Sequence, residues 1–205
     1  PGAASLAKYL YGRGGGFPVY QNTAMTYFPG GEAKFEELLR QLETAKKYIF
    51  LEYFIIQEGK MWNTILDILR QKAAEGVDVR VIYDDMGCIM ILPTGYDKTL
   101  EQMGIKCRIF NPFVPILSSR FNTRDHRKIC VIDGNVGFTG GINLADEYIN
   151  AYEKHGHWKD TSILLKGEAV FNLTVMFLSM WDYLDGTIGK TDYSRYYPTV
   201  WDENA

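Results

Sequence analysis

Hydrophobic residues recur along the chain with either the 3.6-residue period of a helix or the two-residue period of a strand. Residues 32–47 show the helical period clearly, with apolar side chains at positions 35, 38, 39 and 42. The run at 48–56 is rich in β-branched and aromatic residues, as buried strands are, and 77–83 alternates apolar and polar residues. The pattern predicts helices at 32–47, 61–75, 143–152 and 168–184, another helix ending at Gly104, and strands at 48–56, 77–83, 105–110, 128–132, 136–139 and 161–165.

Strands and helices therefore alternate, and a turn at 133–135 joins two of the strands in a hairpin. This order predicts an α/β fold in which helices flank a mixed β-sheet. Residues 1–31 are rich in Gly, Tyr and Pro, and we expect a linker there with one short strand. The expected organisation is one lobe at 32–185, without an internal repeat, and a tail or linker at 186–205.

Composition places the chain among globular proteins. It has 205 residues, 46% of them hydrophobic and 23% charged, which excludes a disordered or collagen-like chain. Lys and Arg number 22 against 25 Asp and Glu, and this net charge of −3 argues against a dedicated nucleic-acid binder. The three widely spaced cysteines indicate neither a disulfide framework nor a zinc site. No apolar run is long enough to span a bilayer, so the chain is expected to be soluble as it stands.

Candidate chemistry concentrates in residues 125–143, DHRKICVIDGNVGFTGGIN. His126 and Lys128 are two residues apart on a predicted strand, so their side chains share one face. Asp133 is seven residues from His126, and this odd spacing turns it to the opposite face. Gly140 and Gly141 allow a backbone to approach a ligand closely. Asn143 adds an amide donor where a helix is predicted to begin.

These residues match the H-x-K-x4-D-x6-G-[GS]-x-N signature of the phospholipase D superfamily at every defined position. From about Val19 to Trp181 the chain resembles bacterial cardiolipin synthases of the phospholipase D type. The resemblance also rests on the segments YFPGGEAKFEELL, AKKYIFLEYFII, GVDVRVIYDDMG, FNPF and HWKDTSILLKGEAV. It implies a phospholipase D-like lobe.

The resemblance implies a mechanism. His126 would be the nucleophile of a phosphohistidine intermediate, and the signature groups it with Lys128 and Asp133 as catalytic residues. Lys128 and Asn143, beside Gly140 and Gly141, would hold the phosphate oxygens. At the position of the family's orienting carboxylate stands Asp160, which would fix the tautomer of His126. The strand parity gives Asp133 a structural role instead, as a cap of its own turn. Neither a metal nor another cofactor is implied.

Several nearby residues are candidates for the rim of this site. Glu52 interrupts an apolar strand, and facing the site beside Tyr53 is as plausible as a structural hydrogen bond. Arg124 and Arg127, with Arg120 and Lys128, form a locally basic cluster, for which capture of an anionic substrate is at least as plausible as a solvated face. Asp84 and Asp85 are interpreted as loop-capping or rim residues. His155 and His157 are too few ligands for a metal site and are interpreted as loop polarity.

A single copy of the signature is present, whereas the family takes its general acid from a second histidine in a second copy. The resemblance therefore implies the first catalytic half of a cardiolipin synthase, without the family's amino-terminal membrane helices. The parent would transfer a phosphatidyl group between two phosphatidylglycerol molecules at the bacterial cell membrane, its catalytic part facing the cytoplasm. Its partners would be the membrane surface and a second phospholipase D-like lobe or a second copy, with no nucleic acid. Two alternatives stay open: a homodimeric phosphodiesterase or nuclease of the superfamily, and a catalytically idle module that binds lipid head groups.

Overall fold

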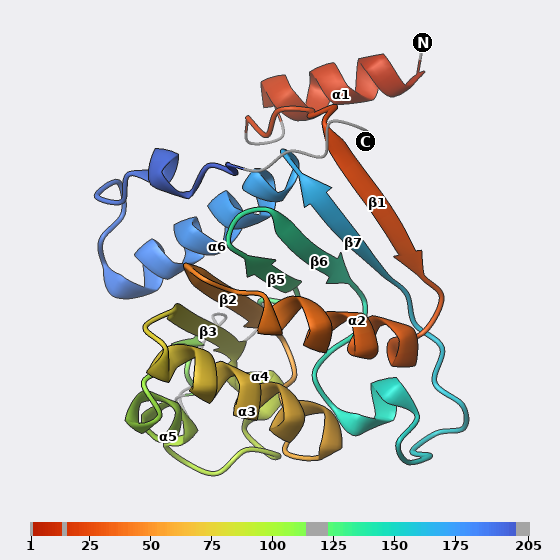
Figure 1. Cartoon of the computed structure of the whole chain (residues 1–205), viewed down its shortest axis with the longest axis vertical. Helices are drawn as coiled ribbons and strands as arrows, with labels where there is room; N and C mark the ends of the chain where they lie inside the picture. Colours follow the sequence, from red (N-terminus) through yellow and green to blue (C-terminus); the bar gives the residue numbers. More distant parts are fainter. Residues whose placement is uncertain (1, 14–15, 114–122, 200–205) are drawn as a thin grey trace.

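A seven-stranded sheet lies between two helical layers in the computed structural model, which describes residues 2–13, 16–113 and 123–199 (Figure 1). The strand order is β1-β7-β6-β5-β2-β3-β4. Strands β2, β3 and β4 are parallel, and the other neighbouring pairs are antiparallel. The predicted mixed α/β fold is thus confirmed. The strands are β1 (Thr23–Phe28), β2 (Tyr48–Tyr53), β3 (Asp78–Asp84), β4 (Lys106–Phe110), β5 (Lys128–Ile132), β6 (Val136–Gly140) and β7 (Ser162–Gly167).

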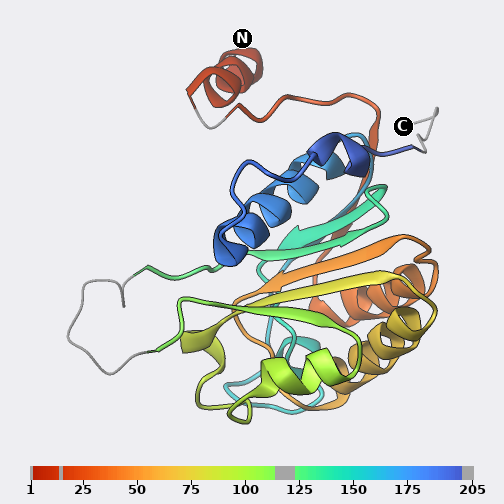
Figure 2. The same cartoon turned by 90° about the vertical axis from the view of Figure 1, so that its left-hand side faces the viewer.

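Helices cover the two faces of the sheet unequally, as Figure 2 shows. Helices α2, α3 and α5 lie on one face, and α6 lies on the other. The α-helices are α1 (Gly2–Arg13), α2 (Gly31–Glu43), α3 (Lys60–Ala74), α4 (Asp85–Cys88), α5 (Tyr96–Gln102) and α6 (Val170–Asp185), and short 3₁₀ turns form η2 (Asp146–Ile149) and η3 (Tyr193–Tyr196).

Alternation along the central strands gives each helical layer its own core. On β2, Ile49, Leu51 and Tyr53 face α2 and α3, whereas Tyr48 and Phe50 face α6. All six residues of β2 are buried, which explains why its sequence shows a continuous apolar run and not an alternation.

Two regions differ from the sequence prediction. The expected linker at 1–31 contains helix α1, and its strand β1 pairs with β7 along its whole length. Where a helix was expected at 143–152, the structure has only the short turn η2. Leu144 instead forms a β-bridge with Ile56, and its carbonyl oxygen accepts a hydrogen bond from Gln57 N. Two residues later, Asp146 accepts hydrogen bonds from Lys60 N and Met61 N and so caps α3.

The segment after α6 packs back on the lobe. Asp182, buried in α6, accepts hydrogen bonds from Thr191 Oγ1 at 2.7 Å and from the Tyr193 hydroxyl at 3.0 Å. Tyr196 then packs edge-on against Tyr48. Residues 186–196 of the expected tail therefore belong to the layer formed by α6.

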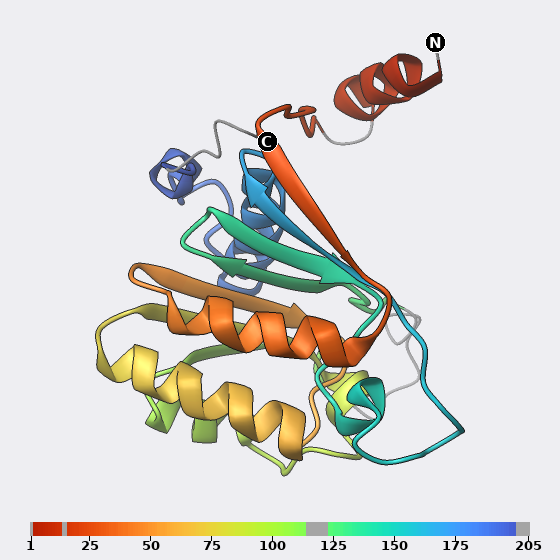
Figure 3. The ribbon, with the colours of Figure 1, turned by 45° about the vertical axis from the view of Figure 1, so that its right-hand side comes forward.

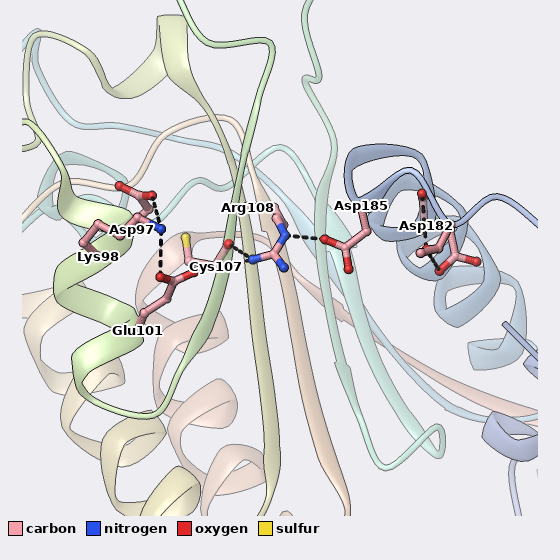
Figure 4. A network of polar contacts seen from close by, with 8 residues as sticks. Asp97, Lys98, Glu101, Cys107, Arg108, Asp182 and Asp185 are labelled. Carbon is pink, nitrogen blue, oxygen red and sulfur yellow. Dashed lines mark hydrogen bonds and ion pairs between the residues drawn. The ribbon is translucent and has the colours of Figure 1, made fainter. Parts of the chain in front are cut away.

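Polar contacts close the sheet edge formed by β4 (Figure 4). Arg108 on β4 is paired with Asp185 at the end of α6, with 2.5 Å between Nε and Oδ1, and its guanidinium lies 4.9 Å from the ring centre of Trp181. Arg80 lies 5.2 Å from the same ring.

Within the described ranges, no helix is both long and apolar enough to cross a membrane.

Candidate active site

The residues of the signature, apart from Asp133, lie at the edge of the sheet formed by the ends of its strands, and these strand ends are seen at the right of Figure 3. Parallel strands β2 and β3 end at this edge, and antiparallel β5 begins there, with Tyr53 opposite Lys128. Strand β6 ends at the same edge where β7 begins, with Gly140 opposite Ser162. Ligands of open α/β sheets bind at such an edge, beyond the carboxyl ends of the parallel strands.

His126 and Lys128 lie side by side, as their spacing predicts. The Lys128 Nζ is 3.0 Å from His126 Nδ1 and donates to the His126 carbonyl oxygen at 2.6 Å. The imidazole is exposed, and its centre lies 4.7 Å from the ring centre of Phe54, which follows β2. An exposed imidazole held by a neighbouring ring and ammonium is accessible to a substrate.

The Lys128 side chain is buried at the sheet edge, although its ammonium reaches the imidazole. Burial lowers its pKa to about 8, and the negative charges of Asp125 and Asp160 act against this shift. The pKa of Lys128 therefore lies close to neutrality, where a bound anion would stabilise the charged form.

Asp160 lies against the glycine loop. A Cβ at position 141 would be 2.0 Å from Asp160 Oδ1, so glycine is required for the carboxylate to lie over this backbone. The same oxygen accepts a hydrogen bond from Thr161 N at 2.7 Å. Gly140 has a φ of 152°, and a Cβ there would be 2.4 Å from the Thr161 carbonyl oxygen. The two glycines thus bring the ends of β6 and β7 together.

Asn143 follows this loop and is buried. Its Oδ1 accepts from Ile55 N at 3.0 Å, and its Nδ2 donates to the Tyr148 hydroxyl at 2.8 Å. The amide therefore joins the segment after β2 to η2, and a single hydrogen bond of its Nδ2 is made within the described residues.

Asp133 is separated from His126 by the full length of β5, about 20 Å at the rise of a strand. Its carboxylate accepts hydrogen bonds from the backbone N–H groups of Lys46, Lys47 and Tyr48, at 2.8, 2.8 and 2.9 Å. The structure thus does not bring Asp133 to the catalytic group in which the signature places it. The structural role expected for Asp133 is thus supported, but Asp133 caps the segment before β2 and not its own turn.

The arginines expected to attract an anion are paired with acids. Arg124 lies 3.1 Å from Asp84, and Arg127 lies 2.8 Å from Asp125 and 2.7 Å from Glu52. Arg124 and Arg127 are therefore ion-paired, and their place at the rim of the site stays a prediction. Arg120 lies outside the described residues.

Asp84 and Asp85 accept hydrogen bonds from the backbone of nearby segments, and one of these segments leads into His126. Asp84 Oδ1 accepts from Met86 N and so caps α4, and Asp84 Oδ2 accepts from Asp125 N at 2.8 Å. Asp85 accepts from Phe113 N. These hydrogen bonds agree with loop capping, and a place at the rim of the site stays a prediction for both acids. Asp84 also fixes the residue that precedes His126.

Glu52 faces away from Tyr53, toward the α6 side of the sheet, and is fully buried. Neither carboxyl oxygen receives a well-aligned hydrogen bond from the described residues, although Arg127 Nη2 is near. Burial raises the pKa of Glu52 well above its ordinary value, Asp125 raises it further, and Arg127 opposes the shift. Glu52, Asp125 and Arg127 thus form a polar cluster beside the segment that contains His126 and Lys128.

Lys34 is a buried cation that the sequence analysis did not single out. Its side chain is 2% exposed, and its Nζ donates a long 3.4 Å hydrogen bond to the Tyr53 hydroxyl. No acid of the described residues forms an ion pair with it, and burial lowers its pKa to about 8. Its place on α2 could have been found from the sequence, because Lys34 precedes Leu38 and Leu42 by four and eight residues on the apolar face.

The side chains that could bind a metal do not gather into a metal site among the described residues. Across residues 2–13, 16–113 and 123–199, no group of three or more His, Cys, Asp or Glu side chains is arranged to hold an ion.

Comparison with known proteins identifies the family. The family model described as "Cardiolipin synthase, PLD-like domain" matches residues 38–181. The chain belongs to this family. A cardiolipin synthase of Listeria monocytogenes is 38% identical over 181 residues, which make up 87% of this chain and 37% of that protein. An uncharacterized protein of Streptococcus mutans is 59% identical over 177 residues, 86% of this chain and 38% of that protein.

Solved structures agree on the fold. NucT from Helicobacter pylori superposes with a TM-score of 0.61 at 12% identity, covering 78% of this chain and 96% of that one. A phospholipase D family member, Nuc from Salmonella typhimurium, gives 0.53 at 19% identity, covering 80% of this chain and 94% of that one. The predicted family and lobe architecture are confirmed. The chain of this cardiolipin synthase-like domain spans less than two fifths of the curated relatives described above.

Proposed function

We propose that this chain is the first catalytic half of a cardiolipin synthase and transfers a phosphatidyl group through a phosphohistidine at His126. One observation carries the proposal: the exposed His126 imidazole lies 3.0 Å from the Lys128 ammonium at the sheet edge. A nucleophile and a cation for the phosphate are thus adjacent. The match of residues 38–181 to the cardiolipin synthase family indicates the lipid substrate class.

The reaction is a double displacement. The imidazole nitrogen of His126 attacks the phosphorus of one phosphatidylglycerol, a P–N bond forms, and the P–O bond to glycerol breaks. The glycerol oxygen takes a proton from a second histidine. The hydroxyl of a second phosphatidylglycerol then attacks the phosphorus, gives its proton to that histidine, and breaks the P–N bond. Cardiolipin and glycerol are the products, and no cofactor is required.

Lys128 and Asp160 set the tautomer of His126 in this scheme. When the ammonium donates to Nδ1, the imidazole proton resides on Nε2, and that nitrogen cannot attack. A bound phosphate draws the ammonium of Lys128 to its own oxygens. Solvent water then removes the proton from Nε2 and supplies one to the freed Nδ1. The Nδ1–H donates a hydrogen bond to the carboxylate of Asp160, which leaves the lone pair of Nε2 as the nucleophile. The influence of Asp160 on the pKa of Lys128 supports its place near this pair.

The phosphate oxygens are held by the cation and by the glycine loop. Lys128 supplies the charge, and Gly140 and Gly141 let a phosphate approach the end of β6. Asn143 contributes its remaining N–H group, with its orientation already fixed by Ile55 and Tyr148. Preorganised donors of this kind stabilise the charge that develops in the transition state.

The general acid must come from outside the described site, because one histidine cannot stand on both sides of the phosphorus. We assign it to a second phospholipase D-like lobe, or to a second copy of this chain. The working location is the membrane surface, with the lobe on the cytoplasmic side of a bacterial cell membrane. The net charge of −3 provides no basic excess for a nucleic-acid partner.

An activated phosphodiester tests His126 without the second lobe. A nitrophenolate leaving group departs without a proton, so the general acid becomes unnecessary. We expect a burst of about one nitrophenolate per chain and an acid-labile adduct located on His126 by mass spectrometry. Phosphatidylglycerol should give cardiolipin only where a second lobe or a second copy completes the site.

Two variants complete the test. H126A should abolish the burst and the adduct, and K128M should slow the burst by roughly 100-fold, the usual effect of losing one donor to the transition state. S179A, on the far side of α6, is the matched control and should behave as the wild type. An equal burst in H126A, or an adduct on another residue, would refute the assignment of the nucleophile.

A further inference from the structure

Helix α1 is the part of the described chain whose folding the lobe does not explain. Figures 1 and 3 show α1 standing off the sheet beyond the start of β1. None of the residues 2–12 is buried. A free helix of 12 residues is marginally stable in water, because few hydrogen bonds offset the cost of nucleation. The helix therefore requires an external surface.

One side of α1 is apolar. Leu6, Tyr9 and Leu10 are 58%, 61% and 46% exposed, and their spacing of three and four residues puts them on a single stripe. Lys8 lies on the opposite side of the helix. Tyr11, which is 60% exposed, lies on the same side as Lys8. Exposed leucines and tyrosines together with a basic residue are typical of helices that lie in the membrane–water interface.

Charge along the chain indicates the nature of that surface. Residues 1–31 contain no Asp or Glu and two basic residues, Lys8 and Arg13, so they carry +2. Since the whole chain carries −3, residues 32–205 carry −5. A partner protein that bound α1 would also contact the acidic lobe beside it, and its surface would have to suit both charges. An anionic bilayer attracts the basic residues 1–31 and repels the acidic residues 32–205. This asymmetry orients the chain with α1 toward the bilayer.

We infer that α1 is an interfacial helix that docks the lobe on bilayers of anionic phospholipid, with Leu6, Tyr9 and Leu10 inserted below the head groups. The choice of an anionic lipid rests on the proposed function, because phosphatidylglycerol is the substrate class proposed there. Binding at α1 would bring to the bilayer the end of the sheet at which β1 begins, whereas the candidate site lies at the opposite end, where β7 begins.

Vesicle flotation with the 205-residue chain tests this inference. The probes are vesicles of phosphatidylcholine alone and vesicles that contain one third phosphatidylglycerol. We expect the chain to float with the second kind only, and high salt to weaken binding. L6E/L10E should lower the bound fraction on the order of tenfold, because it removes two apolar side chains and adds two charges of the same sign as the lipid.

The matched control is M90E/I188E. Met90 and Ile188 are 90% and 71% exposed and lie outside α1, so this pair makes the same change of charge elsewhere. It should float as the wild type does. Y9W should shift its fluorescence to the blue on binding and be quenched by brominated lipid, which a purely electrostatic association would not produce.

Three results would overturn the inference: equal flotation of L6E/L10E and wild type, no flotation of the wild type, or loss in L6E/L10E of a dimer that forms without vesicles. The last result would assign α1 to a protein interface. Burst assays with the activated phosphodiester separate this test from the proposed function, because that substrate is soluble. A normal burst in L6E/L10E isolates the docking defect, whereas flotation without a burst would leave α1 docking intact and refute the nucleophile.

Discussion

Replacing Asp133 separates the structural part of the signature from its chemistry. The carboxylate of Asp133 receives three backbone N–H groups, from Lys46, Lys47 and Tyr48, at the entry to the central strand β2. D133A removes all three hydrogen bonds, and D133N replaces the oxygen that accepts from Lys46 N with a donor. Position 133 also has a φ of 51°, which Asn tolerates and Ala does not.

The magnitude follows from these contacts. A hydrogen bond to a charged group contributes about 1.5–3 kcal/mol when buried, and less where water competes, as it does at Lys46 and Lys47. With the left-handed backbone adding about 1 kcal/mol, D133A should lower the free energy of unfolding by roughly 3 kcal/mol. D133N should cost about 1 kcal/mol, since it keeps the acceptor for Lys47 and Tyr48.

Thermal and urea unfolding measure this effect. For a chain of this size, Tm should fall by roughly 10 °C in D133A and by about 3 °C in D133N. The burst of the activated phosphodiester per folded chain should be unchanged below the transition in both variants. An unaltered Tm in D133A, or a D133N protein that is stable but forms no adduct, would refute the structural role of this residue.

Three further predictions concern the core, the glycine loop and the tail. K34M should raise stability by about 3 kcal/mol at neutral pH, because the pKa of Lys34 is lowered from 10.5 to about 8 by burial. As pH rises, Lys34 loses its proton in the folded state before it does so in the unfolded state. The free energy of unfolding of the wild type should therefore rise relative to that of K34M between about pH 8 and 10.5. Urea titrations of both proteins would contradict this if the difference in their free energies of unfolding stayed constant over that range. G141A should displace Asp160, whose Oδ1 would be 2.0 Å from the new Cβ, and slow the burst on the order of tenfold with Tm little changed; an unchanged rate would show that the position of Asp160 is not required. D182A should detach residues 187–193 from α6, because Thr191 and Tyr193 lose the carboxylate that accepts their hydrogen bonds. Limited proteolysis should then cut this segment at least several times faster in D182A than in D182N, whose remaining oxygen keeps one of the bonds. If D182A resisted proteolysis as well as the wild type does, Asp182 would not hold this segment in place.

Local patterns explain how much of the fold could be predicted. The spacing of Phe35, Leu38 and Leu42 predicts helix α2, and the apolar run of β2 predicts a central strand. Both predictions succeed because the side chains that an element buries recur with the period of that element along the sequence. The helix expected at 143–152 failed for the opposite reason. Leu144 pairs with Ile56 and Asp146 caps α3, and these partners are more than 80 residues away. Contacts of that range leave no period in the sequence.

The candidate site divides in the same way. The sequence by itself determined that His126 and Lys128 share a face and that glycines stand where β6 ends, since strand parity and residue type suffice for each. Only the tertiary structure decided that Asp133 caps the entry of β2, that Arg124 and Arg127 are neutralised by acids from three separate segments, and that Lys34 lies buried beneath Tyr53. The physical reason is that charge pairing and burial depend on which strands become neighbours, and the strand order β5-β2-β3 is set by packing of the whole sheet.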